Sequence, residues 1–310
     1  MKRMKQSHRA ILAAVVCHGF WGVSFLASRT ALNTAPVILL LSHRFLLAFL
    51  MMSLLLFIPG IDCHLLHKDL KPLLLLGLIE PVIYFFGEQY GLLHSTTSFS
   101  GVMISIIPIV STLAAVPILG EKPTARQLFY SVLSVLGVIG IGLLNKNSGT
   151  LDWIGVAALL VAVFSAAAYT LLNRSYTDRY TPFERSYMML AVGAVVFTVL
   201  ALIRVRGSAA EYLQPLHTQS YRAAVVFLAV CCSVICYFLA GYVLSNLSIA
   251  RATVFANLTT AVSVLTSVLI LHEPFSVTGL VCCALILLGI YGVQKTAGKE
   301  NASSEEEQTA

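Results

Sequence analysis

The sequence predicts an all-α, polytopic membrane protein with ten transmembrane helices in two inverted five-helix repeats. Charged residues form only 11% of the 310 residues and apolar residues form 58%, whereas soluble domains carry about 25% charged residues. The mean hydropathy is +0.85. A chain of this composition has too few polar residues to form the surface of a soluble protein around so large an apolar core. In addition, residues 90–141 match residues 242–293 without a gap. Composition therefore predicts the membrane environment, and the internal match predicts the repeat.

The internal match depends on residues that seldom coincide in an apolar chain. Coincident Leu and Val carry little weight, but polar residues and glycines coincide as well: Tyr90 with Tyr242, Ser111 with Ser263, Glu121 with Glu273, Gly137 with Gly289 and Gly140 with Gly292. The front of each half matches more weakly, with Arg29 opposite Arg174 and His43-Arg44-Phe45 opposite Glu184-Arg185-Ser186. A duplicated membrane-spanning unit of this kind is typical of transporters.

A helix needs about 20 apolar residues to cross the bilayer core, and ten stretches approach that length. They cover residues 10–27, 36–58, 73–92, 98–119, 128–144, 153–172, 187–203, 223–244, 252–271 and 277–293. The apolar run after residue 9 has no convincing small-residue cleavage site, so we interpret it as the first span and not as a cleaved signal.

The basic residues orient these spans. With the N-terminus inside, most of the 20 Lys and Arg residues fall in cytoplasmic segments, as the positive-inside rule requires. We therefore predict a cytoplasmic N-terminus at 1–9, a first repeat at 10–146, a second repeat at 152–294 and a disordered cytoplasmic tail at 295–310. Because five is odd, the second repeat is inverted, so Glu121 faces the cytoplasm and Glu273 faces outside.

Composition and motifs argue against several other classes. The basic residues form no single basic face, so we expect no nucleic-acid partner. The seven cysteines show no metal-ligand spacing and six lie in apolar spans, so we interpret them as packing residues and expect no metal. The spans contain no zinc-protease or nucleophile-elbow motif, and no nucleotide-binding loop occurs. We therefore expect neither an enzyme nor an ATP-driven pump, and no cofactor.

Each half ends in a compact turn before a glycine-rich last helix. The turns read Leu-Gly-Glu-Lys-Pro at 119–123 and Leu-His-Glu-Pro at 271–274, and the first span contains His18-Gly19-Phe20-Trp21-Gly22 followed by Ser24-Phe25. Over nearly its whole length the chain resembles the EamA-type family of the drug/metabolite transporter superfamily. The resemblance implies a carrier of small metabolites in the bacterial inner membrane, often an exporter. The second copy departs at His272 and Ala166, which replace Gly120 and Trp21, so symmetry does not double any role of Trp21.

The third span carries Glu80, Tyr84 and Glu88 at a spacing of four residues, which places them on one helix face. A carboxylate in hydrocarbon is costly, so this face must look into the protein or a watery cavity. At about 1.5 Å per residue, Glu80 and His18 both lie roughly 10–12 Å from the cytoplasmic boundary, and Arg44 is level with Glu88 nearer the outside. We therefore predict an Arg44–Glu88 ion pair and a titratable His18–Glu80 pair.

Both pairs have a structural alternative. Arg44 and Glu88 would then form a fixed bridge between the second and third spans, and His18 would be a hydrogen-bonded packing histidine. Glu80 precedes Pro81, whose missing N–H frees a carbonyl and opens the helix locally. Because desolvation favours the protonated form of a carboxyl group, Glu80 is the residue we expect to couple transport to protons.

Further residues are candidates for the lining of a cavity: Trp21, Ser24, Ser105, Tyr169, Tyr237, Asn257 and Thr260. Ser105 and Asn257 are equivalent in the two repeats, and equivalent positions near the axis form midplane sites in such transporters. For the aromatic residues, core packing or the interfacial belt is the alternative. We interpret Glu121 and Glu273 as turn residues, and the glycines of the fifth and tenth spans as faces for close helix contact, with a homodimer seam as an open alternative.

The mixed lining of aromatics, hydroxyls, one Asn and few charges suits a small amphipathic solute such as an amino acid or a derivative. We therefore predict a secondary transporter, an exporter or exchanger that works by alternating access, with the small-molecule substrate and the lipid bilayer as its partners. The alternatives are a nucleotide-sugar or drug carrier of the same superfamily, and a non-transporting membrane protein. A nucleotide sugar would require more inward basic residues than Arg44.

Overall fold

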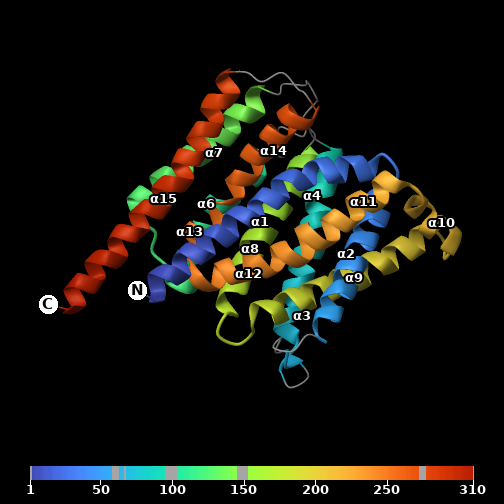
Figure 1. The fold of residues 1–310 in the computed structure, drawn as a ribbon, viewed down its shortest axis with the longest axis horizontal. Coiled ribbons are helices and arrows are strands. Elements are labelled where there is room, and N and C mark those ends of the chain that lie inside the picture. Colours follow the sequence, from blue (N-terminus) through green and yellow to red (C-terminus); the bar gives the residue numbers. More distant parts are fainter. Residues whose placement is uncertain are drawn as a thin grey trace.

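The computed structural model describes residues 2–57, 63–65, 68–94, 103–144, 153–271 and 277–309. These described residues form helices and turns and contain no strand, which confirms the all-α class. Among the described residues, seven helices are long and apolar enough to cross a membrane, and two shorter apolar helices cover Ile107–Leu119 and Ala125–Gly140. Figure 1 shows the helices packed side by side in one bundle.

Helical stretches lie in all ten predicted spans. In the first half they are α1 (Lys2–Leu32), α2 (Val37–Leu55), α3 (Lys71–Gly77), η2 (Leu78–Ile83), α4 (Tyr84–Leu93), α6 (Ile107–Leu119) and α7 (Ala125–Leu144). In the second half they are α8 (Trp153–Ser175), α9 (Pro182–Arg204), α11 (Gln219–Phe227), η4 (Leu228–Ile235), α12 (Cys236–Asn246), α13 (Ile249–Thr253), α14 (Ala256–Leu271) and α15 (Val277–Thr309). Two short elements, α10 (Ala209–Leu213) and η3 (Gln214–His217), occupy the long connection after α9.

The outer surface of this bundle is apolar. Large apolar side chains stand exposed on several different helices, among them Leu12, Phe129, Phe164, Val195 and Leu269. A soluble protein rarely exposes extended apolar surface of this kind, whereas bilayer hydrocarbon solvates it well. The protein is therefore a membrane protein.

Each repeat packs largely against the other repeat. The helix α1 contacts α12 and α14, and at the equivalent place in the second repeat α8 contacts α4 and α6. In the same way α2 contacts η4 and α9 contacts η2, while α7 packs against α15, its own repeat counterpart. Each contact of a helix in the first repeat with the second repeat has a counterpart in which the two repeats change roles. A pseudo-two-fold arrangement requires this correspondence.

The third and eighth spans both lose regular α-helical geometry at the same place in the repeat, in η2 and η4. In η2, Glu80 has φ −139° and ψ 124°, because a residue before proline is driven out of the α region and Pro81 has no N–H to donate. In η4, Ser233 stands at the repeat position of Pro81, and its Oγ donates to the Leu228 carbonyl oxygen at 3.0 Å. The opening predicted at Pro81 is present, and the second repeat contains a counterpart without proline.

Glu121 joins the two repeats at one face of the bundle. Its Oε1 accepts from Arg174 Nε at 3.0 Å, and its Oε2 accepts from the Ile249 backbone N–H at 2.7 Å. The turn of the first repeat is therefore bonded to the end of α8 and the start of α13, a role beyond the turn geometry predicted from the sequence. Its counterpart Glu273 lies outside the described residues.

Other polar contacts gather on the same face as Glu121. Lys68 Nζ pairs with Glu184 at 2.7 Å, and Glu184 also forms a capping box with Thr181 at the start of α9. Near the N-terminus, Arg251 Nη2 donates to Ser7 Oγ at 3.0 Å. Figure 1 shows the two chain ends on one side of the bundle and α10 at the other. Because both chain ends lie on the same side of the bundle (Figure 1), the arrangement agrees with an even number of membrane crossings.

The fifth and tenth spans, α7 and α15, pack closely through their glycines. A Cβ atom at Gly137 would lie 2.7 Å from the Cys282 carbonyl oxygen, and one at Gly289 would lie 2.6 Å from the Tyr130 carbonyl oxygen. Side chains at these positions would push the helices apart. The predicted close packing is confirmed, and both glycine faces are occupied within one chain.

The C-terminal end differs from the sequence-based expectation. The helix α15 continues to Thr309, where a disordered tail was expected at 295–310. Ala, Lys, Glu and Gln have high helix propensity, and the last span supplies a helix that is already nucleated, so the costly first turn need not form again. The low apolar content of this segment therefore does not prevent a helix.

Candidate functional site

The opening at Glu80 turns the polar residues of the third span toward the interior of the bundle. Glu80 and Glu88 are buried, with 8% and 9% of their surface exposed. Tyr237 Oη on α12 donates to Glu80 Oε1 at 3.4 Å, and Tyr84 Oη donates to Glu88 Oε1 at 3.0 Å. Gln89 Nε2 donates to the other oxygen of Glu88 at 3.3 Å. One carboxylate is thus held by a tyrosine of the second repeat and the other by its own helix.

Arg44 on α2 is a buried cation within electrostatic range of these carboxylates. Its Nε donates to Ser233 Oγ at 2.8 Å, and its guanidinium carbon lies 5.3 Å from the ring centres of Phe45 and Phe85, a cation–π arrangement. Among the described residues, the terminal nitrogens Nη1 and Nη2 have no hydrogen-bond partner. Arg44 interacts electrostatically with both Glu80 and Glu88.

The predicted Arg44–Glu88 ion pair is not formed. Within the described parts of the chain, no carboxylate oxygen lies within 4.0 Å of an Arg44 nitrogen. The two residues have matching depths, but α2 packs on α9 and η4. The arginine therefore points toward Ser233 of the second repeat.

The predicted His18–Glu80 pair is also absent. His18 Nδ1 lies 3.1 Å from Thr259 Oγ1 on α14, and its ring packs against Trp21 and Phe255. This face of α1 meets α14, whereas Glu80 meets Tyr237 of α12. The structure shows the alternative, a hydrogen-bonded packing histidine.

Two backbone carbonyls at the helix openings accept hydrogen bonds from the opposite repeat. Trp21 Nε1 on α1 donates to the Cys232 carbonyl oxygen in η4 at 3.0 Å. Ser165 Oγ on α8 donates to the Ile79 carbonyl oxygen in η2 at 2.7 Å. Ala166 occupies the position of Trp21 in the second repeat and has no side-chain donor, and the adjacent residue Ser165 supplies the hydrogen bond there. A search for hydrogen-bond donors next to Ala166 in the sequence would therefore have identified Ser165.

Aromatic side chains surround the two carboxylates. Tyr169 is buried, and its hydroxyl accepts from Asn173 Nδ2 at 2.7 Å. Trp21 packs edge-on to Tyr237, with 6.1 Å between ring centres. These residues belong to one packed group with Tyr84 and Phe85. The central polar cluster, as named from here on, consists of Trp21, Arg44, Glu80, Tyr84, Glu88, Tyr169 and Tyr237.

The remaining predicted residues have other surroundings. Ser24 Oγ donates to the Trp21 carbonyl of its own helix at 2.7 Å. Asn257 Nδ2 donates to Ser134 Oγ at 3.2 Å, so Asn257 faces α7 and lies apart from the central polar cluster. Ser105 is buried just before α6, and Thr260 is half-buried on α14. The equivalence of Ser105 and Asn257 therefore does not by itself identify a site, because the ninth span turns Asn257 toward the fifth.

Arg185 on α9 is the repeat counterpart of Arg44, and no role was predicted for it. Its guanidinium donates to the carbonyl and side-chain oxygens of Asn173, to the Gly241 carbonyl oxygen at 3.1 Å and to Ser245 Oγ at 2.6 Å. Arg185 thus joins α9 to α8 and α12, while Arg44 keeps its terminal nitrogens available. The match between Arg44 and Arg185 in the two halves is the sequence signal for this pair.

Several known proteins are similar to this chain. The profile of the EamA-like transporter family matches residues 8–143 and 153–294. The uncharacterized transporter YcxC of Bacillus subtilis is 31% identical over 292 residues, which cover 93% of each chain. A probable terminal-alkyne amino-acid exporter of Streptantibioticus cattleyicolor is 25% identical over 240 residues and covers 76% of this chain and 77% of its own.

A solved crystal structure supports the same fold. It matches with a TM-score of 0.78 and 16% sequence identity, and the match covers 94% of this chain and 98% of that one. At that identity the similarity concerns the fold alone. The family profile, in contrast, matches each half of the chain in turn, which agrees with the exchanged contacts of the two repeats. The chain therefore belongs to the EamA-like transporter family and is a membrane transporter.

Proposed function

We propose that the protein is a secondary carrier that exports or exchanges a small amphipathic metabolite, an amino acid or a derivative of one, by alternating access. The observation that carries this proposal is Arg44, a buried arginine whose terminal nitrogens have no partner among the described residues and which lies within electrostatic range of Glu80 and Glu88. A guanidinium group matches a carboxylate through two parallel hydrogen bonds. The two carboxylates complement a substrate ammonium group.

The aromatic members of the central polar cluster suit the apolar part of such a substrate. Trp21, Tyr169 and Tyr237 present ring surface next to the charged groups. Transporter sites of this type combine apolar walls with a few placed polar groups. The similarity to a probable terminal-alkyne amino-acid exporter supports the amino-acid class.

A nucleotide-sugar substrate fits this cluster less well. Its phosphates carry several negative charges, and phosphate recognition requires Arg or Lys groups. In the described part of the central polar cluster, Arg44 stands opposite two carboxylates. The zwitterion of an amino acid offers an opposite charge to both kinds of group, whereas a diphosphate offers only negative charge.

The way the repeats are joined supports alternating access. The openings in η2 and η4 are bonded across the repeats by Ser165 and Trp21, and Glu121 joins the repeats at the face that carries the N-terminus. We place this face in the cytoplasm of a bacterial cell, as the basic residues favour. Rocking of one repeat against the other would exchange these contacts and expose the central polar cluster to each side in turn.

Glu80 is the group that we propose for proton coupling. It lies at the helix opening, is buried, and has the Tyr237 hydroxyl as its hydrogen-bond donor at 3.4 Å. A buried carboxyl that alternates between a dry and a wet environment gains and loses a proton, because desolvation favours its neutral form. Protonation during one half of the cycle would then change the charge that the substrate meets.

The experiment compares metabolites outside the cell by mass spectrometry. A strain that lacks the gene is complemented with wild type, with Arg44→Gln, or with Arg204→Gln, in which an exposed arginine at the end of α9 is replaced as a matched control. We expect wild type and Arg204→Gln to raise the extracellular level of one amino acid or derivative, and Arg44→Gln to leave it at the deletion level. Accumulation of a solute without a carboxylate, or equal export by Arg44→Gln, would overturn the substrate assignment.

A further inference from the structure

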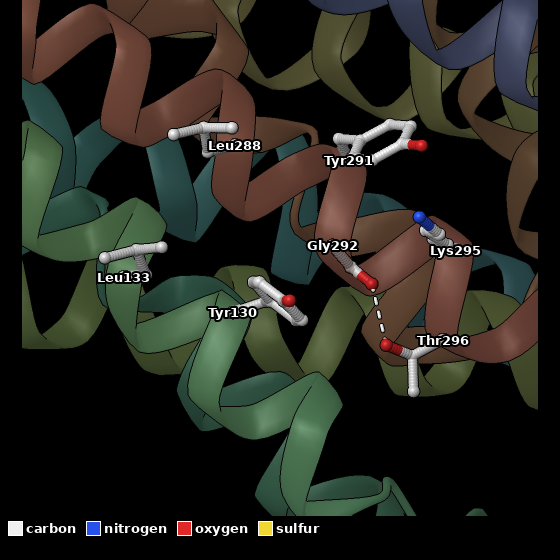
Figure 2. Close-up of a pocket in the computed structure, with 7 residues that line it drawn as sticks. All are labelled: Tyr130, Leu133, Leu288, Tyr291, Gly292, Lys295 and Thr296. Carbon is white, nitrogen blue, oxygen red and sulfur yellow. Dashed lines mark hydrogen bonds between the residues drawn. The ribbon is translucent and has the colours of Figure 1, made fainter.

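A hollow on the bundle surface lies between α7 and α15, apart from the central polar cluster. Its volume is about 270 Å³, and its lining includes Tyr130, Leu133, Leu288, Tyr291 and Lys295. Figure 2 shows Tyr130 and Leu133 projecting from α7 and the other three from α15. We call this hollow the α7–α15 groove.

The lining of the α7–α15 groove changes in chemistry along the membrane normal. The two helices run antiparallel, because Gly289 approaches Tyr130 while Gly137 approaches Cys282. Leu133 and Leu288 therefore lie nearer the membrane centre, the two tyrosines lie one turn further out, and Lys295 follows the tyrosines. The order is apolar, aromatic and then cationic toward the face that carries the N-terminus.

The polar groups of the groove are available to a ligand. Lys295 is exposed, and its Nζ lies 5.5 Å from the ring centre of Tyr291. Within the described residues, neither this ammonium group nor the hydroxyls of Tyr130 and Tyr291 has a hydrogen-bond partner. Thr296, in contrast, donates to the Gly292 carbonyl oxygen at 2.8 Å, as the dashed line in Figure 2 shows. Tyr291 and Leu288 are 61% and 55% exposed, so the groove opens toward lipid.

We propose that the α7–α15 groove binds one anionic phospholipid. The lipid phosphate lies at Lys295, its glycerol region lies between the tyrosine hydroxyls, and an acyl chain follows Leu133 and Leu288. Basic pockets between transmembrane helices recognise anionic head groups in this way, and aromatic rings occupy the interfacial level.

The surrounding charges also favour an anionic ligand. Arg126 is exposed and lies one turn before Tyr130 on the same helix face, which adds a second cation at the level of Lys295. The nearby carboxylate of Glu121 is paired with Arg174, so it does not neutralise these cations. The groove is positive at its outer end and apolar at its inner end, which complements the negative head group and the acyl chains of an anionic phospholipid.

The test uses the purified full-length protein in detergent and native mass spectrometry. It is titrated with phosphatidylglycerol, with phosphatidylethanolamine of the same acyl chains, and with glycerol 3-phosphate. We expect phosphatidylglycerol to bind best, and Lys295→Gln to weaken that binding about fivefold, as the loss of one basic residue near an anionic head group implies. We expect a double variant with both Lys295→Gln and Arg126→Gln to bind phosphatidylglycerol more weakly still. Lys71→Gln removes an exposed lysine at the start of α3 and is the matched control, with binding unchanged.

Three results would overturn the assignment. Equal binding of phosphatidylglycerol and phosphatidylethanolamine by the wild type would show that it has no site for an anionic head group. A Lys295→Gln variant that binds phosphatidylglycerol as well as Lys71→Gln does would show that the lipid sits elsewhere. Displacement of phosphatidylglycerol by glycerol 3-phosphate at similar concentration would identify a soluble-anion site without an acyl chain. None of these readouts involves transport, so their outcome is independent of the proposed function.

Discussion

Trp21 Nε1 donates to the carbonyl oxygen of Cys232 at 3.0 Å and so bonds the first span to the opening of the eighth. Ser165 bonds the sixth span to the opening of the third in the same way, through the Ile79 carbonyl oxygen at 2.7 Å. Each donor belongs to the repeat opposite its acceptor. The two helix openings are therefore also the points at which the repeats are tied together.

Loss of the Trp21 donor should lower stability. Trp21→Phe keeps an aromatic ring but leaves the Cys232 carbonyl unpaired, which costs about 1–3 kcal/mol when such a group is buried. We expect a lower midpoint of thermal unfolding in detergent, and a similar decrease for Ser165→Ala. Trp153→Phe is the control, because Trp153 is 81% exposed. Equal midpoints for Trp21→Phe and Trp153→Phe would show that the bond contributes little.

The two equivalent arginines should differ in what they support. Arg185→Gln removes donors to Asn173, Gly241 and Ser245, and a hydrogen bond from a charged group is worth about 1.5–3 kcal/mol. We therefore expect Arg185→Gln to lower the monodisperse yield in size-exclusion chromatography. Arg44→Gln should keep that yield and lose export. If both variants lost yield to the same extent, Arg44 would be a structural residue like its counterpart.

Replacement of Glu80 should remove the pH dependence of transport. Glu80→Gln has nearly the same shape but no titratable proton, so we expect uptake into proteoliposomes that no longer varies with pH, with the folded yield intact. Glu88→Gln is the comparison, because its carboxylate is held by two donors, Tyr84 and Gln89, and we expect it to retain the wild-type profile. An unchanged pH profile in Glu80→Gln would remove Glu80 from the coupling step.

Cysteine labelling should place the two ends of the bundle on opposite sides of the membrane. We expect Lys122→Cys to react only with a reagent that reaches the cytoplasm, and Glu211→Cys on α10 to react with an impermeant reagent added outside. Glu273→Cys, whose position lies outside the described residues, should label together with Glu211→Cys if the second repeat is inverted. Labelling of positions 122 and 273 from one side would contradict the inverted topology.

The labelling background requires one further change. Six of the seven cysteines lie in the membrane-spanning helices, and Cys63 lies in the connection between α2 and α3. Burial raises the pKa of the Cys63 thiol, which slows its reaction with maleimides because the thiolate is the nucleophile. Cys63→Ser removes the remaining background signal.

Much of the fold is predictable from the sequence because hydrocarbon imposes strict rules on the chain. Apolar stretches of bilayer length must be helical, and ten of them were found where helices occur. The match of Glu121 to Glu273 and of Gly137 to Gly289 predicted the repeat, and the Gly137 and Gly289 faces do pack closely. Pro81 predicted the helix opening, because proline lacks the N–H that a helix needs.

The tertiary structure decided which of the polar residues meet. Counting residues along a helix gives the depth of Arg44, Glu88, His18 and Glu80 but not the neighbour that each helix face meets. Because each repeat packs on the other, Arg44 points to Ser233 and His18 to Thr259, and neither predicted pair is formed. Sequence patterns determine depth through the rise of the helix, whereas rotation and partners follow from side-chain packing among all spans at once.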